Sequence, residues 1–170
     1  MSHNNYILNL LDIKDKNIKI NENQLFYKKI DNIVYKVIEG TLTYKPLFCP
    51  CCGCVFNEKQ TYEKNGFKSS DILLLDVCGH GCILRLKKQR FLCRSCNKKF
   101  FAETSIVNKH CFISNSVKYA IALDLKNKIS EKDIANRYRV STNTVERIIY
   151  SYYDGKTLYK HYLPEVLSFD

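Results

Sequence analysis

Two pairs of cysteines in the chain have the spacing of metal ligands. Cys49 and Cys52 form one C-x-x-C pair within a C-P-C-C-G string, and Cys93 and Cys96 form a second pair. A two-residue spacer lets both thiolates of one tight turn reach the same ion, and a tetrahedral zinc ion takes four thiolates at about 2.3 Å. The spacing therefore predicts a zinc ribbon in which these four cysteines bind one zinc ion.

The residues around the two pairs fit such turns. Gly53 and Asn97 follow them directly, and both residue types tolerate the left-handed backbone that a tight knuckle needs. The gap from Cys52 to Cys96 is longer than in a simple ribbon, so residues 55–92 must supply an extra hairpin. Four thiolates leave no open coordination position, and the zinc is therefore expected to be structural. The alternative is a small β domain with ordinary reduced cysteines.

A shifted ligand register is also open. Cys54 could replace Cys52 if it paired with Cys51 as the C-x-x-C motif. Pro50 and Gly53 favour the first register, because they then occupy the usual positions of a knuckle. The cysteines outside the predicted site have no assigned role: Cys51, Cys54, Cys78, Cys82 and Cys111.

A second metal site is a weaker possibility. Cys78 and Cys82 flank His80, with a glycine on each side of the histidine. Such a short chelate is uncommon, and a glycine turn is the commoner interpretation. The chain has 9 cysteines and no basic region followed by an apolar core at its N-terminus. Reduced thiols and metal binding are therefore favoured over disulfides.

Positive charge is concentrated in one part of the chain. The net charge is +10, and residues 85–114 carry 8 basic side chains against 1 acidic side chain. A basic, cysteine-rich chain of this size points first to nucleic acid. The cluster is predicted to contact DNA phosphates without sequence preference, unless it is only a solvated surface. Its members are Arg85, Lys87, Lys88, Arg90, Arg94, Lys98 and Lys99.

Residues 115–150 change to a helical period and read as three helices. The first covers about residues 115–127. Ser130 opens a capping-box pattern before the second helix, and Ser141 can cap the third. The string 129–149 has the form of a helix-turn-helix. An ordinary three-helix bundle or an interaction module is the alternative.

The third of these helices is expected to read DNA. Val145, Ile148 and Ile149 recur at helical spacing and form its buried face, so Asn143 and Arg147 point away from it. Asn can pair with adenine and Arg with guanine in the major groove. The predicted DNA contacts of this domain are Arg137, Arg139, Ser141, Thr142, Asn143, Thr144 and Arg147.

The remaining elements complete an α+β fold. A short helix is predicted at 6–11 and strands near 33–38, 72–75, 82–93 and 99–104. No run of about 18 apolar residues occurs, so no transmembrane helix is expected. The predicted domains are an N-terminal helix and strands at 1–44, a zinc ribbon at 45–106, an all-α helix-turn-helix domain at 107–153, and a linker at 154–170.

Taken together, the chain resembles the N-terminal half of bacterial insertion-sequence transposases of the ISL3 family. The resemblance covers nearly all of the 170 residues. It rests on the strings 12–18, 49–53, 88–96, 129–149 and 163–170. It implies that the zinc ribbon and the helix-turn-helix bind the terminal inverted repeats of a mobile element. Double-stranded DNA is then the partner, with a homo-oligomer on DNA left open, and the bacterial cytoplasm and nucleoid are the expected location.

The resemblance also implies a catalytic domain that the sequence does not contain. The family cuts and joins DNA with two Asp and one Glu around divalent metal, and Asp170 matches the first of these carboxylates. The later acids are absent, so magnesium is expected only in a full-length enzyme and no catalysis is expected from this chain. A free-standing zinc-ribbon/helix-turn-helix transcriptional regulator is the alternative function. A zinc enzyme is disfavoured, since four cysteine ligands leave no site for substrate.

Overall fold

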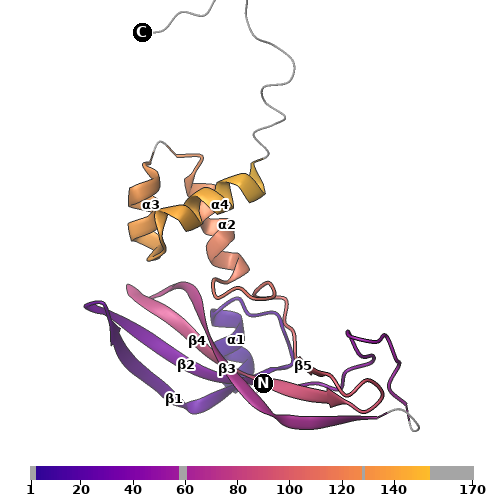
Figure 1. The fold of residues 1–170 in the computed structure, drawn as a ribbon. Helices are drawn as coiled ribbons and strands as arrows, with labels where there is room; N and C mark the ends of the chain where they lie inside the picture. The colour runs from indigo at the N-terminus through magenta and orange to yellow at the C-terminus, as the bar shows by residue number, and fades with distance from the viewer. Residues whose placement is uncertain (1–2, 58–60, 128, 154–170) are drawn as a thin grey trace, which may run out of the picture. The chain divides into compact units, whose positions relative to one another are not determined.

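The chain contains two compact units, the first ending at Val117 and the second beginning at Lys118. The computed structural model describes residues 3–57, 61–127 and 129–153 (Figure 1). The first unit holds a β-sheet and one helix, and the second holds helices. Among the described residues, no helix is long and apolar enough to cross a membrane.

The first unit is built around a five-stranded sheet. Its strands are β1 (Ile18–Ile30), β2 (Ile33–Leu42), β3 (Tyr62–Val77), β4 (His80–Cys93) and β5 (Lys99–Phe101). Their order is β1-β2-β4-β3, and β5 pairs with β4 beyond the end of β2. The β2 and β4 strands run parallel, and all other pairs are antiparallel. The β4 strand is therefore the central strand of the sheet.

Two tight turns close the hairpins of this sheet. Asp31 and Asn32 join β1 to β2, and Cys78 and Gly79 join β3 to β4; all four have positive φ angles. A two-residue turn of this hand matches the right-handed twist of the strands. Asn, Asp and Gly tolerate the left-handed backbone, which explains three of the four residue types.

The core of the first unit lies mainly under one face of the sheet. Leu84 and Leu86 of β4 are fully buried, and Ile72 and Leu42 pack with them. The α1 helix (His3–Leu10) contacts β1 and contributes Leu8 to the same core. Burial of these side chains removes apolar surface from water and is the main term that stabilises the unit.

Gly40 of β2 is fixed by a close approach of the neighbouring strand. A Cβ atom at this position would lie 3.3 Å from the Ile20 side chain and 3.3 Å from the Lys19 carbonyl oxygen. Gly40 does not end the strand, because β2 continues to Leu42. The glycine lets β1 and β2 stay paired next to the irregularity that follows Ile20.

The second unit contains the helices α2 (Asn115–Asp124), α3 (Glu131–Tyr138) and α4 (Thr142–Tyr152), and the boundary between the units falls inside α2. The Ser130 hydroxyl accepts a hydrogen bond from the Asp133 backbone N–H at 3.1 Å and caps α3. The Ser141 hydroxyl accepts one from the Thr144 backbone N–H at 3.3 Å and caps α4. Both caps agree with the sequence prediction.

The structure describes a mixed chain of a sheet and four helices, with a sheet larger than a simple ribbon. The strands of segments 1–44 and 45–106 share this one sheet, because β2 lies between β1 and β4. The β1 strand is not among the strands that the sequence predicts. Its pairing shifts register between Ile20 and Leu25, and this irregularity breaks the period-two pattern by which strands are recognised.

Replacing Gly40 by valine is expected to destabilise the first unit by about 1–3 kcal/mol, because the branched side chain has to push a backbone carbonyl and a buried isoleucine aside. Thr41→Val is the control on the same strand, since it changes a half-buried position that already carries a branched side chain. The midpoint of urea unfolding of the zinc-loaded chain measures the effect. Equal midpoints for the two variants would contradict the role of Gly40.

Candidate metal centre and nucleic-acid interface

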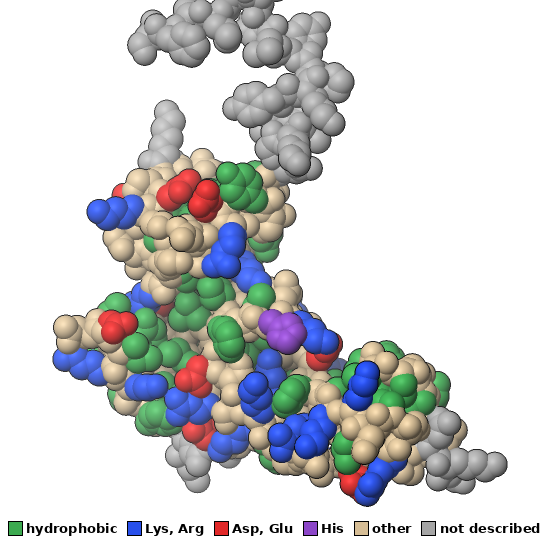
Figure 2. Space-filling model, viewed as in Figure 1, with side chains coloured by type: hydrophobic (Ala, Val, Ile, Leu, Met, Phe, Trp, Pro, Cys, Tyr) green, Lys and Arg blue, Asp and Glu red, His purple; other side chains and the backbone are tan. Residues whose placement is uncertain are grey.

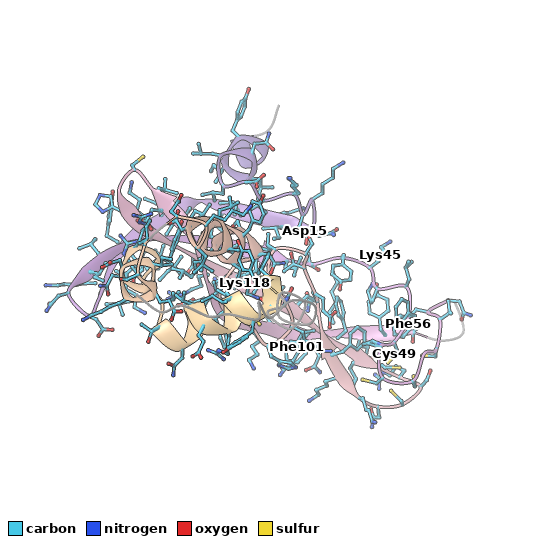
Figure 3. All side chains as sticks on the ribbon, turned by 90° about the horizontal axis from the view of Figure 1, so that it is seen from above. Asp15, Lys45, Cys49, Phe56, Phe101 and Lys118 are labelled. Atoms are coloured by element: carbon cyan, nitrogen blue, oxygen red, sulfur yellow. The ribbon has the colours of Figure 1, made fainter. Side chains whose placement is uncertain are left out.

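The structure brings the four predicted ligands together. The Sγ atoms of Cys49, Cys52, Cys93 and Cys96 all lie within 4.8 Å of one another. Across the pairs, the Cys49 Sγ lies 3.8 Å from the Cys96 Sγ, and the Cys52 Sγ lies 3.9 Å from the Cys93 Sγ. Within the described residues this is the one group of potential ligands that could hold a metal ion. Figure 3 shows the sulfur atoms gathered beside the labelled Cys49, with Phe56 close by.

Each pair of cysteines lies in a knuckle of similar backbone geometry. In the first, the Gly53 N–H donates to the Cys49 carbonyl at 2.8 Å, and Gly53 has φ +72°. In the second, the Asn97 N–H donates to the Cys93 carbonyl at 2.9 Å, and Asn97 has φ +57°. The left-handed conformation predicted for these two residues is confirmed. The Cys51 N–H also points at the Cys49 sulfur, at 3.4 Å.

The packing around the knuckles is aromatic. Phe56, Tyr62, Phe91 and Phe100 form a chain of ring contacts with centroid separations between 5.0 and 6.2 Å. Phe91 is fully buried, two residues before Cys93 on β4. The rings fix the strand end that carries the second knuckle, and this small core holds the thiols in place.

The four thiols cannot all ionise without a cation. Burial opposes ionisation of Cys93, but backbone N–H groups and neighbouring thiols lower its pKa to about 6. The backbone N–H of Lys98 acts to lower the pKa of Cys96, but burial and the three other thiols raise it to about 12. The pKa of Cys49 is also lowered and that of Cys52 is raised to about 11, so Cys49 and Cys93 ionise at the expense of Cys52 and Cys96. A bound divalent cation removes this conflict, and soft thiolate donors at tetrahedral spacing fit zinc.

The possible second metal site is not assembled. Cys78 lies exposed in the β3–β4 turn, whereas Cys82 is fully buried in the core. Burial raises the pKa of Cys82 to about 11, which keeps it a neutral thiol. Cys82 is a core residue in this structure, and the glycine turn is the better interpretation.

Part of the basic cluster is paired with acids of the sheet. Arg85 donates to both carboxylate oxygens of Asp71, at 2.9 and 3.0 Å, and also lies 3.9 Å from Glu39. Lys87 donates to Glu39 at 3.0 Å. The Arg85 guanidinium holds the pKa of Asp71 below its ordinary value. These two basic and two acidic groups compensate each other, which the sequence could not reveal because the acids lie on β2 and β3.

The remaining members of the cluster differ in their surroundings. Arg94 pairs with Glu63, and the Arg90 Nε donates to the Asn65 carbonyl at 2.6 Å. Burial lowers the pKa of Lys88, which is half-buried. Lys98 and Lys99 are exposed. Figure 2 shows Lys and Arg side chains across the sheet unit, with Asp and Glu side chains among them.

The start of α4 is exposed and polar. Val145 and Ile148 are buried on one side of the helix, and Asn143 and Arg147 are exposed on the other. Ile149 is half-buried. The Arg147 guanidinium donates to the Asn143 carbonyl and to the Thr144 hydroxyl, both at 3.2 Å. The exposed start of the helix therefore presents the hydroxyls of Ser141 and Thr142 and the amide of Asn143, with the half-buried Thr144 hydroxyl beside them and the Arg147 guanidinium one turn further on.

Arg137 has a structural contact instead of a free guanidinium. It donates to Asp124 at 2.7 Å, and the Tyr138 hydroxyl donates to the same carboxylate at 2.9 Å. Burial, followed by the bond to Asp124, raises the pKa of Tyr138 to about 12. These contacts tie α3 to the end of α2. Arg139 follows in the left-handed conformation, with φ 54°, and forms the turn before α4.

Both the cysteine region and the helical region match models of known domain families. Residues 45–96 match the family model described as the zinc-finger of transposase IS204/IS1001/IS1096/IS1165. Residues 102–153 match the helix-turn-helix domain of transposase family ISL3. The chain carries the two N-terminal domains of the ISL3 transposase family. No curated protein and no solved structure matches the chain.

The ISL3 match agrees with the geometry. The zinc-finger range begins before the first knuckle and ends at Cys96, so it includes all four clustered thiols. The helix-turn-helix range includes α2, α3 and α4. The resemblance inferred from the sequence is thereby confirmed, and both domains of this family imply a DNA-binding portion of a transposase.

Sequence reasoning missed two residues that shape these sites, and it named a third, Cys54, only in an alternative ligand register. Glu39 and Asp71 neutralise part of the basic cluster, and only the strand register brings them there. Cys54 has its Sγ 3.3 Å from the Cys52 Sγ, so a fifth thiol borders the cluster. The position of Cys54 two residues after Cys52 is the sequence feature that could have indicated this contact. The sequence pattern gives Cys54 a role as a ligand only in a shifted register, paired with Cys51.

Replacing Cys96 by serine is expected to abolish tight zinc binding and to unfold the aromatic core at the knuckles. The helices of the second unit should keep their far-ultraviolet circular dichroism, because they share no ligand with the ribbon. Metal analysis of the purified chain measures the first effect. Cys78→Ser is the matched control, since Cys78 is exposed and outside the cluster, and it should leave one zinc per chain. A full zinc content in the Cys96 variant would refute the ligand assignment.

Proposed function

We propose that this chain recognises the terminal inverted repeats of an insertion sequence as the DNA-binding part of a transposase. The observation that carries the proposal is the first turn of α4, which is exposed, polar and rigidly capped in a helix-turn-helix of the ISL3 family. In a helix-turn-helix, the N-terminal residues of the second helix contact base edges in the major groove.

The chemistry of α4 supports sequence-specific reading. Asn143 offers an amide that pairs with the two adenine groups in the major groove, and Arg147 offers a fork that matches guanine. Thr142 and Thr144 add hydroxyls for phosphates or bases. Since the Ser141 cap fixes the residue at which the helix begins, these side chains occupy fixed positions around the helix axis. The Arg147 guanidinium donates hydrogen bonds within its own helix and stays at the helix surface. There it can exchange these bonds for hydrogen bonds to a base.

We further propose that the four clustered cysteines hold a structural zinc ion. Four thiolates complete a tetrahedral shell, so zinc bound here has no position for water or substrate. The sulfur donors are soft, lie close enough to share one ion and are held by two knuckles, and these properties fit a zinc ion. The bound ion would neutralise the thiolates and fix the ribbon; the chain's own residues supply the hydrogen bonds to sulfur and the aromatic packing.

We expect this chain to bind DNA without cutting it. The match to the ISL3 family covers DNA-binding domains. Asp170, which the resemblance places as the first catalytic carboxylate, and the expected linker 154–170 lie outside the described residues. Phosphoryl transfer by divalent metal needs several converging carboxylates. Incubation of labelled inverted-repeat DNA with the chain and magnesium tests this point, and a nicked or joined product would refute it.

Arg147→Ala is expected to weaken selection of the preferred duplex by about 1–3 kcal/mol, because the variant cannot form a bidentate pair with a base. Non-specific binding should fall much less. Arg147→Lys is the control that keeps the charge and removes the fork, and it should lose nearly as much selectivity as alanine. Enrichment of duplexes from a random pool, followed by competition binding, measures both quantities. Full recovery by lysine would show a phosphate contact instead of base reading.

A pair of double variants tests the basic cluster. Lys98→Gln with Lys99→Gln should flatten the dependence of log affinity on log salt, by roughly 0.9 for each phosphate that the variant no longer neutralises. Arg85→Gln with Lys87→Gln removes the same formal charge, but these side chains are compensated by Asp71 and Glu39. The second pair should leave the salt slope nearly unchanged. Equal slopes for both pairs would mean that the exposed lysines do not contact phosphates.

A further inference from the structure

A fifth thiol, that of Cys54, borders the cluster of four, and a tetrahedral ion can bind only four. The Cys54 Sγ lies 3.3 Å from the Cys52 Sγ and 3.5 Å from the Cys93 Sγ. Both distances are shorter than the 3.8 and 3.9 Å approaches between the two ligand pairs. The Cys54 thiol therefore borders the group of four on the side formed by Cys52 and Cys93.

The backbone holds Cys54 in this position. Its carbonyl oxygen accepts a hydrogen bond from the Cys49 N–H at 2.9 Å, and Phe48 forms an antiparallel bridge with Val55. These contacts make a small hairpin around the first knuckle, with Gly53 in the left-handed conformation between the two cysteines. The hairpin places Cys54 opposite Cys49, so the thiol of Cys54 is directed to the cluster by the fold of the knuckle as well as by its own rotamer.

Exposure distinguishes the five thiols. Cys49 and Cys93 are fully buried, whereas Cys52 is exposed and Cys54 is half-buried. A ligand at the rim of a site leaves the metal more readily than one in the core. Cys52 is thus the ligand of the first knuckle that lies at the rim of the site. The thiol beside it, that of Cys54, is not one of the four predicted ligands.

We propose that Cys54 is a reserve ligand that replaces Cys52 on the metal. In the exchange, the bond from the metal to the Cys52 sulfur breaks as the bond to the Cys54 sulfur forms. The Cys54 thiol gives up its proton and the departing Cys52 thiolate accepts it, so the total charge and the number of bound thiolates stay the same. No oxidation is involved. The inference rests on the proposed zinc site and goes beyond it, by giving the site two interchangeable ligand sets.

The two sets predict an asymmetry between the knuckles. Loss of Cys52 leaves four thiols that can reach the metal, with Cys54 as the fourth. Loss of Cys96 in the second knuckle should not be compensated in this way, because Cys54 belongs to the first knuckle and its thiol lies against Cys52 and Cys93. Both Cys52 and Cys96 are outer members of the cluster, so they form a matched pair for substitution.

Cobalt(II) binding to the full chain tests the proposal, since the charge-transfer absorption of cobalt counts the thiolates bound to it. The wild-type chain should show four thiolates. Cys52→Ser should also show four, with an affinity within about tenfold of wild type, whereas Cys52→Ser combined with Cys54→Ser should show three and bind at least about 100-fold more weakly. Cys96→Ser should resemble the double variant. Identical spectra and affinities for Cys52→Ser and the double variant would overturn the proposal.

Two further arms keep the test decisive. If the wild-type chain takes up no cobalt, the zinc site itself is refuted and the reserve ligand with it. If Cys52→Ser does not fold, Cys54→Ser still decides, because it keeps all four primary ligands. It should retain one zinc per chain but release it to a chelator several-fold more slowly than wild type, since the incoming thiol is missing. Equal release rates in that comparison would overturn the proposal.

Discussion

The thiol cluster and the core of the sheet share one strand, and this constraint organises the first unit. The β4 strand is central in the sheet and ends at Cys93, which is both fully buried and part of the cluster. Phe91 precedes it and packs against the rings of Tyr62 and Phe100. A metal ion bound at the cluster would therefore fix the end of the same strand whose middle residues, Leu84 and Leu86, form the hydrophobic core.

The same strand explains why formal charge is a poor guide to the DNA surface. Along β4, basic side chains lie among apolar ones, and the sequence shows only that this stretch is strongly positive. The parallel pairing of β2 with β4 sets Glu39 opposite Arg85, and the antiparallel pairing of β3 sets Asp71 opposite it from the other side. Ion pairs that solvent can reach contribute little to stability, but the pairs of Arg85 with Asp71 and of Lys87 with Glu39 remove two cations from the set available to phosphates.

The second unit depends mainly on local signals. Ser130 and Ser141 each satisfy a free backbone N–H at the start of a helix. Such caps lie within three residues of the groups that they bind, so they can be read from the sequence. The contact of Asp124 with Arg137 and Tyr138 is different, because it joins two helices. It also uses Arg137, which the sequence analysis predicts to contact DNA.

The sequence alone determined the two knuckles, the left-handed Gly53 and Asn97, and the capped helix-turn-helix, because each of these depends on residues close to one another along the chain. Residue types and spacing also predicted that the two knuckles share one site, but the fold of the strands between them is what brings the two pairs together. The sequence also indicated the family, since the strings 49–53, 88–96 and 129–149 lie within the matched ranges, whereas 12–18 and 163–170 lie outside them. Tertiary structure decided what depends on pairing at a distance: the membership of β1 in the sheet, the partners of Arg85 and Lys87, and the burial of Cys82. It also brought the Cys54 thiol to Cys93, a residue on another strand. The physical reason is that strand register and core packing join residues far apart in the chain, and no local pattern encodes which of them will meet.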